Sequence, residues 1–329
     1  MQKNWSRRHD FIELDKPTLT AMLQPVFPGK QVVEVELLTS GLCNTNYKIK
    51  VSDLADIFVL RLYIRNRAAC QKDYDIFNLV RNRVPVPELL YVDSEGLRHD
   101  IAYAVMQWVD GVLLSDVIAG GNSTDIKACA YSVGQTLAHI GMYTFPRAGF
   151  FGPGFAIAEP FDDVNSIILS TLEQLLFEGN TGPRLGSSRR DQLWHFITAN
   201  AHYLDSVKEN ASLVHSDFKG VNILVRHELD RWQVAAVLDW EFAFAGSPLI
   251  DIANMLRYDR LLPDGFEAEF LRGYREEGGQ LPNGWKQTSK LLDLLSLCEF
   301  LNAPHANNAM IEEVTGLIVG TIEHWGEYI

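Results

Sequence analysis

The feature that most constrains this chain is a polar loop between apolar runs. Residues 213–225 read LVHSDFKGVNILV, and residues 237–241 read VLDWE. Apolar runs at both ends of the polar connector 227–233 are typical of a buried β-hairpin. Such a hairpin would hold Asp217, Asn222 and Asp239 together at one edge of a small sheet. Their oxygen atoms suit Mg²⁺, whose sites keep positions open for substrate phosphates, so we predict a centre for phosphate chemistry.

The spacing within this stretch follows that of a protein kinase catalytic loop. That loop reads His-x-Asp-x-x-x-x-Asn, and a later strand ends in an Asp. His215, Asp217 and Asn222 have this spacing, and Asp239 ends the next apolar run. Each residue alone is compatible with ordinary loop polarity, because Asp and Asn are common in turns. The whole set between two apolar strands favours the catalytic interpretation.

Three segments resemble a known family. The segments HSDFKGVNIL (215–224), LDWE (238–241) and GSPLIDIA (246–253) resemble the aminoglycoside phosphotransferase and choline kinase-like family of small-molecule kinases. The resemblance is strong from about residue 213 to 256 and is traceable from about 35 to 114. The family usually has Gly where this chain has Ser216, which predicts a local difference in the loop backbone.

The resemblance implies an α+β, bilobal protein kinase-like fold. An N-terminal lobe with an antiparallel sheet would span residues 1–108 and bind the nucleotide, with a hinge at about 106–111. A larger, mainly helical C-terminal lobe would span 109–329 and carry the catalytic loop and the acceptor site. The length of 329 residues is sufficient for two packed units.

The resemblance also implies roles for the loop residues. Asp217 would orient the attacking hydroxyl and accept its proton, while Asn222 and Asp239 would hold Mg²⁺ against the phosphates of ATP. Lys219 stands where protein kinases often place a Lys on the γ-phosphate, although this family frequently does not.

Three further residues near the loop are implicated. His215 is a catalytic candidate, although bracing the loop suits it better than proton transfer. Asp251 lies near the start of a predicted helix and would brace the catalytic loop. Glu241 would contact the metal or the acceptor.

The N-terminal part predicts two strands, 32–38 and 47–51, joined by a turn-rich loop. The backbone N–H groups of such a loop can bind phosphates, and the candidates are Ser40, Gly41 and Asn44. Any β-hairpin can carry such a loop, so this signal depends on the downstream motif.

A cation and an acid are predicted to meet in the same lobe. Arg61 lies in the apolar strand 58–63, at the position of the strand Lys that holds phosphates in protein kinases; the alternative is an Arg on the solvent face of an edge strand. The helix 73–81 offers Asp73 as its partner, with Asp75 as the alternative. Either Asp can also be a solvated helix acid.

The hinge would bind adenine. Residues 102–109 form an apolar strand that ends at Asp110-Gly111. By resemblance, the main chain of Gln107 and Val109 would bond the base, and Met106 would line its pocket.

Long helical periods dominate after residue 111. We expect helices near 113–118, 128–140, 164–177 and 193–207, and a flexible insertion at 181–188. The last third is helical and is rich in glutamate, which some family members use to hold amines. We interpret most of the seven glutamates there as solvent-exposed residues on helix surfaces: Glu267, Glu269, Glu276, Glu277, Glu299, Glu312 and Glu313.

Composition narrows the partners. The 29 Lys and Arg against 42 Asp and Glu give a net charge of −13, which disfavours nucleic acid and anionic membranes. The same charge would favour a cationic substrate; the alternative is that it only keeps the protein soluble. Four scattered cysteines, Cys43, Cys70, Cys129 and Cys298, indicate a reduced compartment without structural zinc. With no secretory signal and no apolar run of membrane-spanning length, we predict a cytoplasmic monomer or homodimer.

The prediction is therefore an ATP- and Mg²⁺-dependent phosphotransferase acting on a hydroxyl of a small molecule, with cationic, aminoglycoside-, choline- or homoserine-like acceptors among the options. The alternative is a catalytically silent nucleotide-binding module of the same fold. A protein kinase is disfavoured, because Trp240-Glu241 follows Asp239 in place of Phe-Gly and no Ala-Pro-Glu follows. A two-metal phosphoesterase would need more His and Asp ligands.

Overall fold

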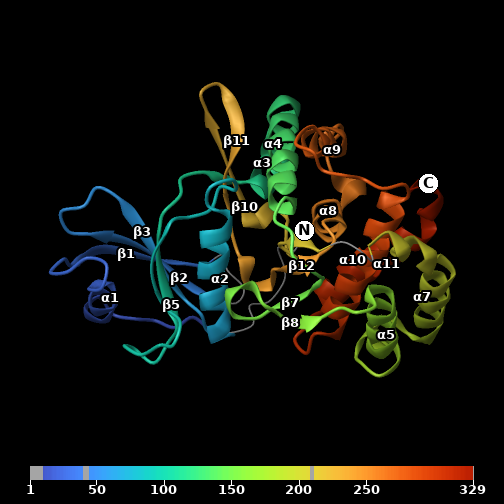
Figure 1. The fold of residues 1–329 in the computed structure, drawn as a ribbon, viewed down its shortest axis with the longest axis horizontal. Helices are drawn as coiled ribbons and strands as arrows, with labels where there is room; N and C mark the ends of the chain where they lie inside the picture. Colours follow the sequence, from blue (N-terminus) through green and yellow to red (C-terminus); the bar gives the residue numbers. More distant parts are fainter. Residues whose placement is uncertain (1–9, 40–43, 208–210, 329) are drawn as a thin grey trace.

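The fold has two parts joined through a central hairpin. The computed structural model describes residues 10–39, 44–207 and 211–328. An antiparallel sheet with α1 and α2 forms one end of the molecule, and α5, α7, α10 and α11 form the other (Figure 1). The predicted α+β architecture, a sheet lobe followed by a mainly helical lobe, is confirmed.

The N-terminal sheet is antiparallel throughout. Its strand order is β1 (Val32–Leu38), β2 (Thr45–Val51), β3 (Ile57–Leu62), β5 (Tyr103–Gln107) and β4 (Leu89–Asp93). Alternate residues of β2 are buried, as the sequence pattern predicts. Helix α1 (Lys16–Leu23) packs its apolar face against this sheet. Its N-cap is Asp15, whose side chain accepts a hydrogen bond from the N–H of Thr18 at 2.9 Å.

Helix α2 (Arg67–Val80) belongs to two cores at once. It begins earlier than the predicted residue 73, because the side chain of Asn66 caps it by accepting from the N–H of Ala68. Its first turns pack Ala69 and Cys70 against the sheet, and its last turns pack Ile76 and Val80 into the C-terminal core. The helix therefore couples the sheet to the rest of the molecule.

The predicted hairpin is present and lies at the centre of the chain's fold. Strand β10 (Ile223–Glu228) pairs with β11 (Arg231–Val237), and Ile223 faces Val237 in the register. Strand β6 (Val112–Leu113) completes this sheet on the other side of β10. A further sheet has the order β8 (Ile157–Pro160), β7 (Gly149–Phe151), β12 (Phe244–Gly246) and β9 (Ser212–Val214).

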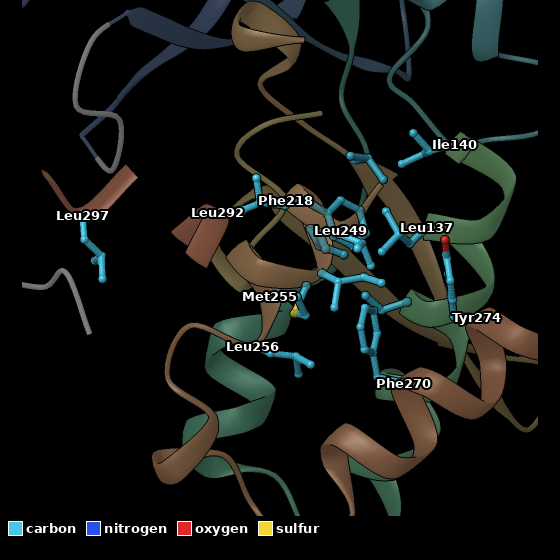
Figure 2. Packing of buried hydrophobic residues seen from close by; sticks show 14 of the residues in the cluster. Leu137, Ile140, Phe218, Leu249, Met255, Leu256, Phe270, Tyr274, Leu292 and Leu297 are labelled. Atoms are coloured by element: carbon cyan, nitrogen blue, oxygen red, sulfur yellow. The ribbon is translucent and has the colours of Figure 1, made fainter. Parts of the chain in front are cut away.

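Helices supply most of the C-terminal part. They are α3 (Leu114–Gly120), α4 (Ser123–Gly141), α5 (Val164–Phe177), α6 (Thr181–Leu185), α7 (Ser187–Asn200), α8 (Leu249–Met255), α9 (Phe266–Glu276), α10 (Trp285–Asn302) and α11 (Asn308–Glu323). Leu137 of α4, Leu249 of α8, Phe270 of α9 and Phe218 of the loop 215–222 belong to one cluster of buried side chains (Figure 2). Because Phe218 is fully buried there, the loop is anchored in the core.

A close helix crossing explains one glycine in this core. A Cβ built on Gly134 of α4 would lie 1.9 Å from the carbonyl oxygen of Phe270 on α9. Only a residue without a side chain fits such a contact. Helices α4 and α9 therefore pack backbone against backbone.

The prediction of a flexible insertion at 181–188 is wrong, because this segment is helical. It forms α6 and the start of α7. The Thr181 hydroxyl donates to the carbonyl of Cys298 at 2.8 Å, and the Arg184 guanidinium donates to the carbonyl of Ala303 at 2.7 Å. These bonds satisfy carbonyls at the end of α10, so the Gly- and Pro-containing segment is held in place.

Within the described residues, no helix is both long and apolar enough to cross a membrane. Residues 108–111 connect β5 to β6 and so link the N-terminal sheet to the hairpin sheet.

Candidate active site

A cavity of about 1610 Å³ lies where the N-terminal sheet, the hairpin and the C-terminal helices meet. Asp217, Asn222 and Asp239 all line it, as do Arg61 and Lys219. Residues from two separate segments of the motif therefore converge on one space, as the hairpin pattern predicts. We call this part of the cavity the polar end.

The catalytic loop is braced by α8. The Asp251 carboxylate accepts the backbone N–H of His215 at 2.7 Å and that of Ser216 at 2.8 Å. The side chain of Asn254 donates to the carbonyl of Ser216 at 2.9 Å. Although burial raises the pKa of Asp251 to about 7, the two N–H groups oppose that shift. Asp251 is thus placed where the sequence suggested a brace.

Ser216 has a backbone conformation that is more typical of glycine. Its φ is +69°, in the left-handed region that L-residues rarely adopt. The bond that the Ser216 N–H donates to Asp251 and the bond that its carbonyl accepts from Asn254 hold the backbone there in spite of the strain.

His215 uses both ring nitrogens inside the protein. It is fully buried; Nε2 lies 2.8 Å from the carbonyl of Leu238, and Nδ1 accepts the N–H of Asp217 at 3.2 Å. This pattern fixes a neutral ring with the proton on Nε2, and burial lowers the pKa of His215. Because neither nitrogen is open to a ligand, the geometry fits a residue that positions the loop.

Asp217 sits between an amine and an amide. Lys219 Nζ lies 2.7 Å from Asp217 Oδ1, and Asn222 Nδ2 donates to Oδ2 at 2.7 Å and to the Asp217 carbonyl at 2.9 Å. The amide nitrogen of Asn222 is therefore used, which leaves its oxygen to bind a cation. The carboxylate of Asp217 is held in one orientation at the cavity wall.

Asp239 reaches the same place from the hairpin. The N–H of Leu238 donates to the carbonyl of Asn222 at 2.9 Å, which ties the two segments together. The Asp239 carboxylate forms an ion pair with Arg61. Burial opposes ionisation, yet the guanidinium holds the pKa of Asp239 below its usual value.

Arg61 is not on a sheet edge. Strand β3 lies between β2 and β5, and Arg61 is only 8% exposed. The solvent-face alternative is therefore wrong. A buried guanidinium needs a counter-charge, which Asp239 supplies.

The expected direct pairing of Arg61 with Asp73 does not occur. Asp73 instead accepts the hydroxyl of Tyr63 at 2.7 Å, and burial raises its pKa to about 6. The shorter Asp side chain stays on Tyr63, close enough for its charge to act on Arg61. The alternative, Asp75, accepts from Gln71 on its own helix at 2.8 Å.

Sequence reasoning missed the residue that ties α2 to the site. Lys72 Nζ donates to the carbonyl of Glu241 at 3.1 Å and to that of Ala243 at 3.4 Å. These carbonyls lie two and four residues after Asp239 in the chain. A lone Lys on a helix gives no signal in the sequence, because most such residues are solvated.

Glu241 points into the polar end. Burial raises the pKa of its carboxyl group, and the side chain of Asn44 is hydrogen-bonded to it. Both residues line the cavity. The other two predicted loop residues, Ser40 and Gly41, lie outside the described residues.

The hinge borders an apolar slot of the cavity. Met106, Gln107 and Val109 all line it. The N–H of Gln107 donates to the carbonyl of Glu88 at 2.9 Å, so an N–H for an adenine ring would come from Val109. Val59 and Leu224 add apolar side chains to the lining.

Comparison with known proteins decides the family. A family model described as a phosphotransferase enzyme family matches residues 34–289. The chain belongs to this phosphotransferase family. The predicted phosphotransferase is thereby confirmed, while a search of curated proteins found no match.

Solved structures agree with the fold of this phosphotransferase. A thermostable variant of aminoglycoside phosphotransferase APH(4)-Ia, in a ternary complex with AMP-PNP and hygromycin B, is 17% identical, with a TM-score of 0.69 over 93% of this chain and 98% of that one. The GDP and kanamycin complex of APH(2")-IIia is 20% identical, with a TM-score of 0.69 over 94% and 99%. At these identities the likeness shows the shared fold.

The polar end of this phosphotransferase fits Mg²⁺. The described residues contain no group of three or more His, Cys, Asp or Glu arranged to hold a metal. What they offer is the amide oxygen of Asn222 and the carboxylate of Asp239, which is 41% exposed at its side chain. Hard oxygen donors in so small a number suit an ion that takes its remaining ligands from water and phosphates.

Proposed function

We propose that this phosphotransferase moves the γ-phosphoryl group of ATP to a hydroxyl of a small molecule. The observation that carries the proposal is the convergence of Asp217, Asn222 and Asp239 on one cavity that also reaches the hinge. The nucleotide and acceptor in the ternary complex of the APH(4)-Ia variant support it by analogy of fold.

Asp217 would be the base. The acceptor oxygen attacks the γ-phosphorus, the bond from that phosphorus to the β–γ bridging oxygen breaks, and the hydroxyl proton passes to Asp217. Asn222 and Lys219 hold the two carboxylate oxygens, so the base is oriented before the acceptor arrives. Lys219 also places a positive charge beside the group in transfer.

Asn222 and Asp239 would hold Mg²⁺, which when bound supplies positive charge to the phosphate oxygens. Arg61 of the N-terminal sheet lines the same end of the cavity. Its guanidinium would contact the phosphates while it keeps its ion pair with Asp239. The Tyr63 ring lies 5.1 Å from the guanidinium carbon of Arg61, and the Tyr63 hydroxyl donates to Asp73 of α2. Glu241 is placed to contact the metal or the acceptor.

The adenine ring of ATP would lie in the slot at the hinge. The main chain of Gln107 and Val109 would bond it, and Met106 would pack against it. A cytoplasmic site of action fits a protein that uses ATP and whose Cys70, Cys129 and Cys298 are free thiols.

The test is Asp217→Asn, which keeps the size and removes the base. Acceptor-stimulated ADP release should fall on the order of 10²–10⁴-fold, while calorimetric binding of ATP with Mg²⁺ stays within a few fold. Screening a library of hydroxyl compounds for stimulated ADP release supplies the acceptor for this assay. Wild-type turnover in the variant would refute the role of Asp217. A wild-type protein that binds ATP but transfers to no acceptor would favour the silent module.

A further inference from the structure

The cavity continues beyond the polar end into a second part with a different character. Its described lining comes from residues 148–175, 242–250 and 292–310. We call this part the apolar half. Strands β7 and β8 pair with each other, and helix α5 packs against α10 (Figure 1).

Three phenylalanines form one wall of the apolar half. Phe150 of β7 lies 4.9 Å from Phe161 and 5.6 Å from Phe244 of β12, between ring centroids, and Phe161 lies 5.9 Å from Phe244. All three line the cavity, and Phe150 is 46% exposed. The exposed face of this ring is apolar area within the cavity that a ligand can cover.

This wall is continuous with the proposed base. Phe244 faces Val214 in the antiparallel register of β12 and β9, and Val214 leads through His215 and Ser216 to Asp217. Asp217 and the three phenylalanines line the same cavity, so a ligand whose hydroxyl reaches Asp217 has the phenylalanines within the same space.

A second wall of the apolar half is also made of apolar side chains. Ile167 of α5, Leu295 and Phe300 of α10 and Met310 of α11 line it. The end of α10 is fixed by Arg184, which bonds the carbonyl of Ala303. The wall is thus preformed.

Charge is scarce in this half. Among its described lining residues, Glu299 is the one carboxylate, and none is Lys or Arg. It is also the one member of the seven C-terminal glutamates that lines the cavity. No described residue forms an ion pair with Glu299. Neighbouring groups partly bury its carboxyl group and raise the pKa of that group, while the residue stays exposed to the open cavity.

We propose that the acceptor is a hydroxyl compound with a sizeable apolar or aromatic body and no more than one ammonium group, seated on the phenylalanines with that ammonium at Glu299. Each ammonium that leaves water needs a counter-charge. The apolar half offers one, which disfavours a polycationic aminoglycoside. This inference rests on the proposed function, because it assumes that the hydroxyl is phosphorylated at Asp217.

The experiment is isothermal titration of four probes into the whole protein, with and without AMP-PNP and Mg²⁺. Phenylalaninol carries a ring, a hydroxyl and one ammonium, 3-phenylpropanol lacks the ammonium, ethanolamine lacks the ring, and kanamycin is polycationic. We expect phenylalaninol to bind roughly tenfold to a hundredfold tighter than ethanolamine, as burial of a phenyl ring implies, and tighter than kanamycin. Equal binding of ethanolamine, or tighter binding of kanamycin, would overturn the inference.

Two variants with matched controls assign the contacts. Phe150→Ala should weaken phenylalaninol about tenfold, whereas Phe177→Ala, an exposed phenylalanine of α5 outside the cavity, should not. Glu299→Gln should weaken phenylalaninol and spare 3-phenylpropanol, and Glu312→Gln should change neither. Unchanged binding in Phe150→Ala would place the ligand elsewhere and overturn the inference.

The same titrations separate the two proposals. AMP-PNP binding is measured first, without any probe. A failure of AMP-PNP to bind in the presence of Mg²⁺ counts against the proposed function, while normal nucleotide binding with a preference for kanamycin counts against the acceptor class alone.

Discussion

At the polar end of the cavity, Asp217, Asn222 and Asp239 are each bonded to a neighbouring side chain or backbone group, whereas Glu299 in the apolar half faces open space. The polar end is also connected to the core through Phe218 and Asp251. The two regions share one cavity but have different physical roles. One fixes reacting groups in place as part of the fold, and the other is a surface kept open for a ligand.

This difference predicts that changes at the polar end cost stability as well as activity. Asp251→Ala removes the acceptor of two buried N–H groups, which should lower the free energy of unfolding by about 3 kcal/mol. Urea denaturation followed by fluorescence measures it. Asp116→Ala, an exposed acid that also lines the cavity, is the control and should change stability by less than about 0.5 kcal/mol. Equal effects would contradict the distinction.

The pH dependence sharpens the same point. The pKa of Asp251 is raised to about 7 in the folded protein, from roughly 3.9 in an unfolded chain. Between these values the folded state binds more protons, so the contribution of Asp251 to stability is largest at low pH and is lost as the pH rises from about 4 to about 7. Asp251→Asn should flatten that decline in urea titrations across the window. A variant with the wild-type slope would show that Asp251 stays ionised.

Ser216 gives a smaller effect of the opposite sign. Ser216→Gly relieves the left-handed backbone and should raise the free energy of unfolding by about 0.5–1 kcal/mol, net of the greater freedom of glycine in the unfolded chain. Ser216→Ala keeps the strain and is the matched control. If both variants were equally stable, the backbone at 216 would carry no strain.

In the apolar half the smallest effect on stability is expected. Ile167 is 38% exposed, so Ile167→Ala should shift the free energy of unfolding by less than about 0.5 kcal/mol. Its neighbour Ile168 is 6% exposed, and Ile168→Ala should cost about 2–4 kcal/mol. A large loss in Ile167→Ala would mean that this wall serves the fold and is not a free surface.

The two regions also differ in how far the sequence predicts them. The polar end is encoded in a short motif, because fixed spacings around a hairpin place His215, Asp217, Asn222 and Asp239 whatever the surrounding helices do. Arg61 is recognisable as a long cation inside an apolar strand. Its partner is not, since an Asp on a helix looks the same whether it meets Arg61 or Tyr63.

The apolar half was not predictable in this way. Phe150, Phe161 and Phe244 come from separate segments, and a hydrophobic residue that lines a cavity has the same sequence pattern as one that fills a core. The segment 181–188 misled for a related reason: its Gly and Pro residues are typical of loops, but tertiary bonds from Thr181 and Arg184 fix it as helix. Glu299 likewise resembles the solvated glutamates around it.

The central claim is that the polar end binds a magnesium nucleotide, and calorimetry of ATP binding with and without Mg²⁺ tests it most directly. For the wild type we predict that Mg²⁺ tightens binding by about tenfold or more, and that Asp239→Asn removes this gain. ATP affinity that is the same with and without Mg²⁺ in the wild type would contradict the account.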